Sequence, residues 1–409
     1  MNSSRKLARA NDRGWVIVSR GLLAWPVLLA LVHLTAWAQG GSASSAPTFP
    51  ATAVSLSSPL DYQVFQRQSR LRGAIEVRGH VAVPTDHVQV RIAGKSLLGP
   101  LPGRWKDIAF DPKTGDFSAK LLEVAGGFYE VDIKTMLGQR ETAEVLVPHV
   151  GVGEVFVVAG QSNSTNYGEV RQNTTTQMVS TFSGENWRLA DDPQPGVQDG
   201  SKNGSFVPSF GDELYRRYGV PIGVASVGHG STSVRQWLPA GDPVEVMPTK
   251  KGYTVRRKDG TLVSDGTLFD GMMARMNQLG EHGFRAVLWH QGESDSHQPP
   301  GHDISATTYA RMLREVILAS RKRAGWDVPW FVAAATYHSP SDRQCLPIRD
   351  AQRSMWESGI ALEGPDTDTL TMQYRQNDGK GVHFNDAGLK AHGLLWARAV
   401  EAYLDKVLR

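Results

Sequence analysis

Short segments in which apolar and polar side chains alternate dominate residues 54–150. Clusters of Gly, Pro and Asp separate them, and the clearest are residues 74–83, 88–92, 128–133 and 143–147. Alternation with a period of two is typical of strands that bury one face. We therefore predict a small antiparallel β-sandwich over residues 54–150. It serves either as a structural accessory domain or as a carbohydrate-binding module.

From residue 151 onward the pattern changes to apolar strands that alternate with helical segments. The predicted helices bury residues at spacings of three and four, and the last helix begins at a capping Asn385 or Asp386. This alternation is typical of an open parallel α/β sheet, so residues 151–409 are predicted to form the second domain. The predicted strands are residues 155–159, 220–227, 284–289 and 330–335, and the other helices are 208–218, 268–279 and about 309–317.

One insertion departs from this pattern. Residues 253–263 alternate around an Asp259-Gly260 turn and carry several basic side chains, which predicts a β-hairpin. Such a hairpin either forms one wall of a binding site for an anionic substrate or is a solvated surface feature.

The N-terminus has the pattern of an export signal. Five basic residues precede an apolar run at residues 22–34, and Ala36-Trp37-Ala38 then offers a small-x-small cleavage site. We predict a signal peptide over residues 1–38, a flexible linker over residues 39–53, and an exported protein that is periplasmic or secreted. The apolar run is shorter than the roughly 20 residues of a spanning helix, so no stable membrane span is expected after cleavage.

Charge and cysteine content narrow the functional classes. The formal net charge is +3, of which the leader contributes +4, so the remaining chain is close to −1 and nucleic acid is not an expected partner. The single cysteine, Cys345, cannot form an intrachain disulfide. No sequence feature specifies an oligomeric state.

Candidate catalytic groups follow the predicted strands of the second domain. Ser162 comes after the first strand in Gly160-Gln161-Ser162-Asn163, and the third strand leads into His290-Gln291-Gly292-Glu293. The carboxyl ends of parallel strands share one sheet edge, which is where such sheets place active sites. Serine needs a base and an orienting acid to act as a nucleophile. His383 can be the base, either Glu293 or Asp378 the acid, and the Ser162 and Gly230 amides with the Gln291 side chain can bind an oxyanion.

These motifs resemble a known family. Gly160-Gln161-Ser162-Asn163, residues 233–237 (SVRQW), residues 268–273 (LFDGMM) and residues 289–295 (WHQGESD) are similar to the sialate O-acetylesterase and acetylxylan esterase group of SGNH hydrolases. The resemblance covers roughly residues 150–405. It implies a three-layer α/β/α flavodoxin-like fold, no metal or other cofactor, and removal of acetyl esters from carbohydrates.

By the same resemblance Ser162 is the nucleophile and His383 the base, and Ser162, Gly230 and Gln291 form the oxyanion hole. The family often has Asp three residues before the histidine, where this chain has Lys380. Lysine cannot accept an imidazole N–H. We therefore assign the acid to Glu293, with Asp378 as the alternative, and expect Gln161, Asn163 and Asp295 to contact substrate.

The favoured hypothesis is a serine esterase that hydrolyses acetyl esters of sialate, xylan or another carbohydrate through an acetyl-enzyme. A carbohydrate O-acetyltransferase, in which a sugar hydroxyl replaces water, is an alternative. A non-catalytic glycan-binding protein on the same fold is the other, and Lys380 motivates it.

Overall fold

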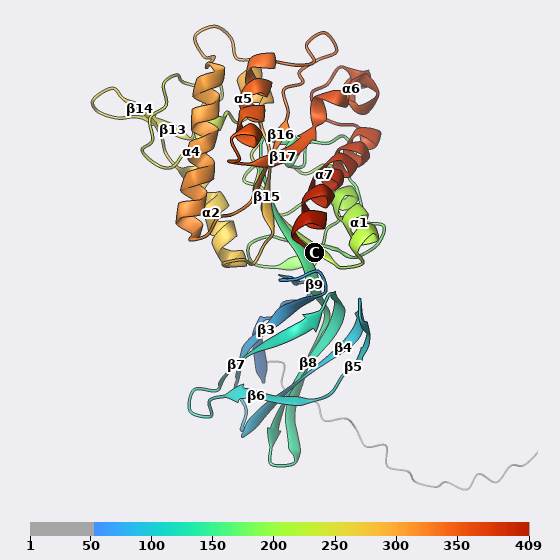
Figure 1. Ribbon diagram of the computed structural model, residues 1–409. Coiled ribbons are helices and arrows are strands. Elements are labelled where there is room, and N and C mark those ends of the chain that lie inside the picture. The colour runs from blue at the N-terminus through green and yellow to red at the C-terminus, as the bar shows by residue number, and fades with distance from the viewer. Residues whose placement is uncertain (1–52, 409) are drawn as a thin grey trace, which may run out of the picture. The chain divides into compact units, whose positions relative to one another are not determined.

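The computed structural model describes residues 53–408 (Figure 1). The predicted signal peptide and all of the predicted linker except residue 53 lie outside the described residues and stay predictions. Among the helices of residues 53–408, none combines the length and the apolar character needed to cross a bilayer.

The N-terminal part consists of strands that pair mainly in antiparallel fashion. Its core lies beneath alternating positions, as in β8, where Tyr129, Val131 and Ile133 are at most 1% exposed while Glu130 faces solvent. The strands expected from alternation are therefore present. They are β1 (Val54–Ser58), β2 (Val64–Gln66), β3 (Arg72–Val81), β4 (His87–Ser96), β5 (Gly99–Pro102), β6 (Lys106–Phe110), β7 (Asp116–Ala125) and β8 (Gly127–Leu137).

The long strand β9 (Arg140–Gly160) belongs to both parts of the chain. Its first half pairs antiparallel with β8, and its second half pairs parallel with β12 and β15. The predicted domain boundary at residues 150 and 151 falls inside this strand. Glu154 of β9 is fully buried and accepts hydrogen bonds from Arg67 at 2.7 Å and from Arg285 at 2.8 Å.

The second part is a mixed α/β fold around a large central sheet. Neighbouring strands run in the order β10, β12, β9, β15, β16, β17 and are parallel, with β11 antiparallel at one edge. The first strand pattern after residue 151 lies within β9. The remaining strands are β10 (Val179–Phe182), β11 (Trp187–Leu189), β12 (Ile222–Ser226), β15 (Ala286–His290), β16 (Trp330–Ala334) and β17 (Leu362–Asp366).

Helices cover both faces of this sheet (Figure 1). Val155 and Val157 of β9 share one core with α2, α4 and α5, whereas Phe156 and Val158 share another with α1 and α7. Both faces are therefore apolar, which explains the unbroken apolar run in β9. The helices are α1 (Val207–Tyr218), α2 (Thr267–Leu279), α3 (Glu293–Ser296), α4 (Ala306–Ala324), α5 (Leu346–Glu357), α6 (Gln376–Gly379) and α7 (Asp386–Val407).

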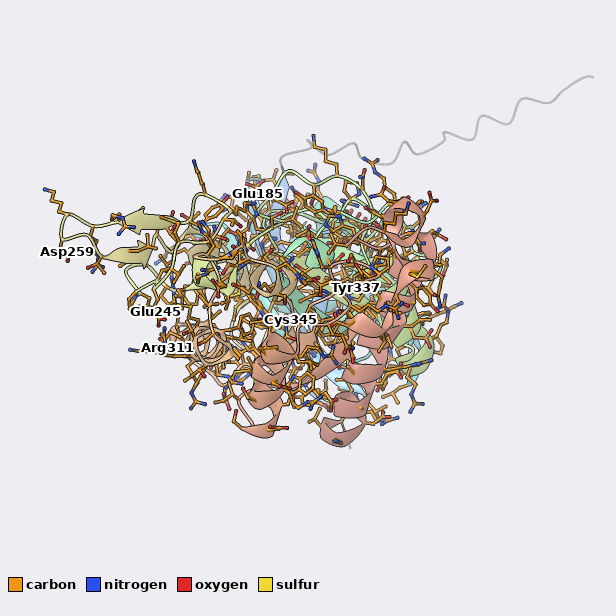
Figure 2. The ribbon with its side chains drawn as sticks, turned by 90° about the horizontal axis from the view of Figure 1, so that it is seen from above. Glu185, Glu245, Asp259, Arg311, Tyr337 and Cys345 are labelled. Carbon is orange, nitrogen blue, oxygen red and sulfur yellow. The ribbon has the colours of Figure 1, made fainter. Side chains whose placement is uncertain are left out.

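Two local predictions are confirmed. Asn385 caps α7 by accepting a hydrogen bond from the Gly388 N–H at 2.9 Å. The expected hairpin consists of β13 (Thr254–Arg256) and β14 (Leu262–Ser264), and Asp259 lies exposed at its outer end (Figure 2).

The buried Glu154 cluster makes a prediction about stability. Replacing Glu154 with Gln leaves the Arg67 guanidinium, which is 1% exposed, without its carboxylate partner. Breaking a buried ion pair costs about 3–5 kcal/mol, so the free energy of unfolding measured by urea titration should fall by that amount.

The matched control is Glu245→Gln, which removes an exposed ion pair with Arg311 (Figure 2). It should change the unfolding free energy by less than about 1 kcal/mol. Equal losses in the two variants would contradict a specific role for the Glu154 cluster.

Candidate active site

The backbone contact between β9 and β15 sets the position of Ser162. The two strands end together, with Gly160 opposite His290. A Cβ atom on Gly160 would lie 2.0 Å from the His290 carbonyl oxygen, and Gly160 has φ of 125°, so only glycine fits there. The chain then enters the 3-10 helix η1 (Ser162–Ser164). The Ser162 side chain is 4% exposed, and its N–H lies in the first helical turn, where backbone donors lack intrahelical acceptors.

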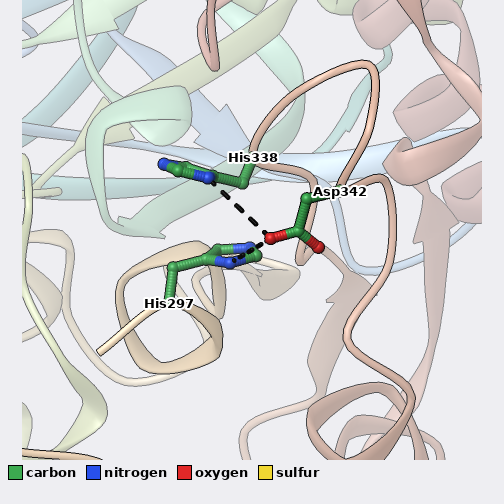
Figure 3. Close-up of side chains that lie close together, drawn as sticks. All are labelled: His297, His338 and Asp342. Atoms are coloured by element: carbon green, nitrogen blue, oxygen red, sulfur yellow. Dashed lines mark ion pairs between the residues drawn. The ribbon is translucent and has the colours of Figure 1, made fainter. Parts of the chain in front are cut away.

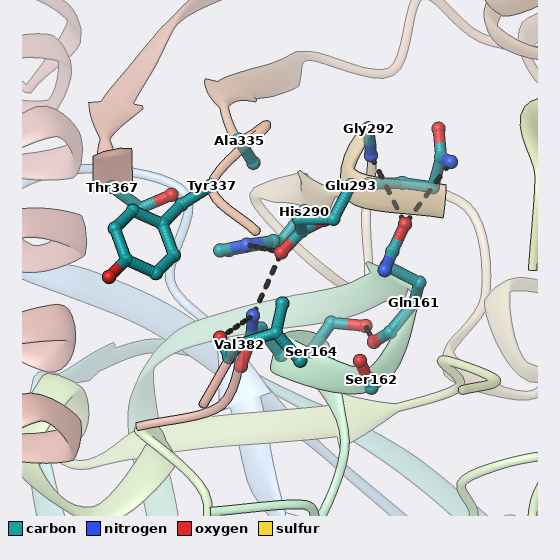
Figure 4. Close-up of polar contacts among 12 residues, drawn as sticks. Gln161, Ser162, Ser164, His290, Gly292, Glu293, Ala335, Tyr337, Thr367 and Val382 are labelled. Carbon is teal, nitrogen blue, oxygen red and sulfur yellow. Dashed lines mark hydrogen bonds and ion pairs between the residues drawn. The ribbon is translucent and has the colours of Figure 1, made fainter. Parts of the chain in front are cut away.

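Glu293 begins α3 directly after β15, beside the Ser162 turn (Figure 4). Its Oε1 accepts hydrogen bonds from Asn163 Nδ2 at 2.8 Å and pairs with His290 Nε2 at 3.0 Å. Its Oε2 is buried and has no hydrogen-bond partner among residues 53–408. Burial alone would raise the pKa of Glu293, but the charge of His290 and the two hydrogen bonds outweigh burial and lower it. Glu293 is therefore a buried carboxylate in which one oxygen, Oε2, can still accept a hydrogen bond.

His383 lies in the loop before α7, and its ring stacks on Tyr167 with the ring centroids 5.1 Å apart. Burial lowers the pKa of His383, the charge of Arg375 lowers it further, and Glu293 acts in the opposite direction. The imidazole is therefore neutral near pH 7, the state that a general base requires.

Asn163 joins the three segments that carry these groups. Its side-chain amide donates to Glu293 Oε1 at 2.8 Å and to the Val382 carbonyl at 3.4 Å. The neighbours of Asn163 and Val382 along the chain are Ser162 and His383. Asn163 was predicted to contact substrate, and in the structure its side chain links the segment of Ser162 to those of Glu293 and His383. Within the described residues, no hydrogen bond joins the His383 ring to Ser162 or to Glu293, and the catalytic roles stay predictions.

Two of the expected oxyanion donors have other partners in the structure. The Gly230 N–H donates to Asp199 Oδ2 at 2.6 Å. The Gln291 side chain is fully buried; its Nε2 donates to Asp295 Oδ2 at 2.7 Å, and its Oε1 accepts from Tyr309 at 3.0 Å. In this arrangement both donors already have partners within the protein, and the roles of Gly230 and Gln291 in an oxyanion hole stay predictions.

Asp295 and Gln161 also have internal roles. Asp295 accepts hydrogen bonds from the Ser233 hydroxyl at 2.5 Å and the Val234 N–H at 2.8 Å, so its carboxylate fixes a neighbouring loop, and its predicted contact with substrate stays a prediction. Gln161 Oε1 accepts from the Ser294 N–H at 2.9 Å, which ties the turn before Ser162 to α3. With its oxygen held there, the Gln161 amide nitrogen is the end of the side chain left for a ligand.

Asp378, the alternative acid, does not reach His383. It is exposed, has φ of 54°, and lines a surface pocket of about 550 Å³ together with Arg375. The charges that act on His383 are those of Glu293 and Arg375. The assignment of the acid to Glu293, with Asp378 as the alternative, stays a prediction, and Lys380 is exposed.

Sequence reasoning missed Arg375. It is 2% exposed, and its guanidinium lies 4.0 Å from the Tyr337 ring centroid and 4.1 Å from that of Phe384. Its Nη1 donates to the Val382 carbonyl at 2.7 Å, which fixes the residue before His383. Burial lowers the pKa of Arg375 to about 10, although Glu293 raises it. No periodic pattern or motif marks Arg375, so the sequence gives no sign of this role.

The hairpin and the segment just before it pack against the loop that contains Gly230. Tyr253 contacts His229 Nε2 through its hydroxyl at 2.7 Å, and Lys250 donates to the Gly230 carbonyl at 2.5 Å. A Cβ atom on Gly230 would lie 2.6 Å from the Tyr167 ring, so this glycine allows close packing against the aromatic partner of His383.

His297, His338 and Asp342 form a group of ligating side chains within residues 53–408 (Figure 3). His297 contacts the Thr336 carbonyl through Nε2 at 2.8 Å and Asp342 Oδ2 through Nδ1 at 2.9 Å. Both ring nitrogens of His297 are therefore occupied by contacts within the protein. The two imidazoles stack with centroids 4.3 Å apart and an interplanar angle of 23°, so their in-plane lone pairs do not converge on one point. The group is a histidine–aspartate contact beside a stacked ring.

Comparison with known proteins identifies the family. A family model described as carbohydrate esterase, sialic acid-specific acetylesterase, matches residues 152–402. The chain belongs to this family. It is a carbohydrate O-acetylesterase. A search of curated proteins finds no match.

The chain is similar to several solved structures, one of which has a TM-score above 0.5. A carbohydrate acetylesterase from Xanthomonas citri is 18% identical with a TM-score of 0.52, covering 87% of this chain and 74% of its own. A protein from Arabidopsis thaliana is 19% identical with a TM-score of 0.44. The match covers 61% of this chain and 98% of the Arabidopsis chain. A family 2 carbohydrate esterase with a carbohydrate-binding domain from Corynascus thermopiles is 15% identical with a TM-score of 0.38. The match covers 86% of this chain and 99% of the Corynascus chain.

The environment of His383 predicts the pH dependence of the esterase. Only the neutral imidazole accepts a proton, and burial with the charge of Arg375 lowers its pKa from 6.5. As pH falls, kcat/KM on an aryl acetate should therefore stay on its plateau until below pH 6.5 and then decline. A decline centred clearly above pH 6.5 would contradict this environment.

Ser162 and Ser164 form a matched pair for a second prediction. Ser162→Ala should lower kcat at least about 10³-fold and abolish labelling by a serine-directed phosphonate. Ser164 donates its hydroxyl to the Gln161 carbonyl at 2.6 Å, so Ser164→Ala should retain labelling. Labelling that persists in Ser162→Ala would place the nucleophile elsewhere.

Proposed function

We propose that this esterase is an exported SGNH-type hydrolase with a three-layer α/β/α catalytic domain at residues 151–409 and a β-sandwich at residues 54–150. Helices on both faces of a parallel sheet and the alternating N-terminal strands support this organisation. Its substrate is an acetylated sugar, such as a sialate or a polysaccharide acetyl ester. The family description supports this substrate class.

The observation that carries the mechanism is the environment of Glu293. One carboxylate oxygen is bound by Asn163 and His290, and the other is buried without a partner, while the Glu293 charge acts on His383. We infer that a movement of the His383 loop brings an imidazole N–H to that free oxygen. Glu293 then orients the ring and stabilises the imidazolium, as the acid of a catalytic triad does.

Reaction begins when Ser162 Oγ attacks the acetyl carbonyl carbon while His383 takes the hydroxyl proton. The Ser162 N–H and the Gln161 amide nitrogen donate to the oxyanion. The tetrahedral intermediate collapses, the sugar oxygen leaves with the proton from His383, and acetyl-Ser162 remains. Water then attacks as His383 removes its proton, and acetate is released when Ser162 recovers the proton.

Substitution of the two carboxylates tests the acid. Glu293→Gln keeps the size of the side chain but removes its charge, so kcat should fall by about 10²–10⁴-fold. Asp378→Asn, on the exposed pocket rim, should leave kcat within about twofold of wild type. The reverse ranking would make Asp378 the acid.

Acetate release tests the function itself. The wild-type esterase should release acetate from at least one of acetylated xylan, acetylated pectin and O-acetyl sialosides, and Ser162→Ala should release none above background. A second arm adds a free acceptor sugar, because an O-acetyltransferase would yield a new sugar ester in place of acetate. Absence of acetate from all these substrates would reject the proposed hydrolase.

A further inference from the structure

A chain of buried side chains extends from Glu293 away from the catalytic groups. His290 Nε2 lies 3.0 Å from Glu293 Oε1, and His290 Nδ1 lies 3.0 Å from His392 Nε2. Trp396 Nε1 lies 3.0 Å from the same His392 nitrogen. All four side chains are at most 6% exposed, so water does not supply alternative partners.

Hydrogen-bonding rules fix the protons along this chain. An indole N–H can only donate, so His392 Nε2 presents its lone pair to Trp396. His290 Nδ1 faces that same lone pair and must therefore carry a proton. Burial lowers the pKa of His392 well below 6.5, and the charges of His290 and Arg375 lower it further, so His392 is the neutral partner.

The other nitrogen of His290 faces Glu293 Oε1. This oxygen also accepts the Asn163 amide, and the pKa of Glu293 lies below its ordinary value, so Oε1 belongs to an ionised carboxylate that can only accept hydrogen bonds. His290 Nε2 therefore carries a proton as well. Both ring nitrogens are protonated, and the pair is a buried imidazolium and carboxylate.

We propose that His290 is a positioning residue for ester hydrolysis: as a buried imidazolium it keeps Glu293 ionised and directs its free oxygen to His383. The inference rests on the proposed role of Glu293 as the acid. His290 touches no reacting atom and acts through Glu293. Trp396 and His392 keep a proton on His290 Nδ1, and the Glu293 carboxylate keeps the other on Nε2.

Other charged and titratable groups also act on this pair. Arg375 is a second cation that interacts electrostatically with Glu293. Its guanidinium donates to backbone carbonyls, and among the described residues it forms no hydrogen bond to the carboxylate. Removing His290 therefore leaves Glu293 with only a distant cation. The groups around the pair are Arg375, His383, His392 and Tyr309.

The first experiment reads the protonation state directly and does not depend on activity. Nitrogen-15 NMR of histidine-labelled full-length protein at pH 7 should show one buried histidine with both ring nitrogens protonated, and this signal should be missing in His290→Gln. A neutral His290 would overturn the proposal. This result stands even if the protein proves inactive on every acetylated carbohydrate, so it separates this inference from the proposed function.

The second experiment is the pH profile of kcat/KM on an aryl acetate. In His290→Gln a buried Glu293 without its adjacent cation holds a proton to higher pH, so the acidic limb should move up by roughly 1–3 pH units and activity should recover on the alkaline side. A merely structural role would lower activity equally at all pH values, and that result would overturn the proposal. His282→Gln, at a histidine whose side chain is 68% exposed, is the matched control and should leave the profile unchanged.

Trp396→Phe gives a second variant in case His290→Gln does not fold. It removes the donor that forces His392 Nε2 to accept, so His392 can donate to His290 and leave it with a single proton. The doubly protonated NMR signal should disappear and the acidic limb should shift in the same direction as in His290→Gln. Retention of that signal in Trp396→Phe would overturn the proposed chain.

Discussion

The parallel pairing of β9 with β15 is the contact on which the rest of the site depends. At the last pair, Gly160 lies against the His290 carbonyl so closely that any side chain would collide with it. Beyond this pair, the Gln161 N–H donates to the His290 carbonyl at 2.8 Å, and Gln161 Oε1 accepts from the start of α3. One backbone hydrogen bond and one side-chain hydrogen bond thus connect the turn that carries Ser162 to the segment that carries Glu293.

At this edge of the sheet the buried Glu293 carboxylate interacts with His290 and Arg375, and the neutral His383 imidazole is influenced by the same charges. A buried charge on Glu293 alone would be costly. His290, which contacts Glu293, and Arg375, which does not, offset that cost. His383 remains neutral because burial and Arg375 outweigh Glu293. The site thus holds a charged carboxylate and an uncharged imidazole, which are the protonation states that the proposed activation of Ser162 requires.

The sequence predicted much of this arrangement because its signals are local. Alternation marked the N-terminal strands, the apolar run and Gly160 marked the end of β9, and Asn385 marked the start of α7. The internal bonds of Gly230, Gln291 and Asp295 were not predictable, because a polar side chain in a motif looks the same whether it faces substrate or a buried partner. Arg375 was missed for a related reason: its partners are carbonyls and aromatic rings from other segments, which leave no spacing pattern.

The central claim is that Ser162, His383 and Glu293 act together at the common end of β9 and β15. The most direct measurement is a crystal structure of the esterase with a phosphonate bound covalently to Ser162 Oγ. The account predicts one His383 ring nitrogen within about 2.6–3.2 Å of an oxygen of the adduct and the other within the same range of Glu293 Oε2. An adduct structure in which His383 stays clear of both groups, or bonds to Asp378 instead, would contradict it.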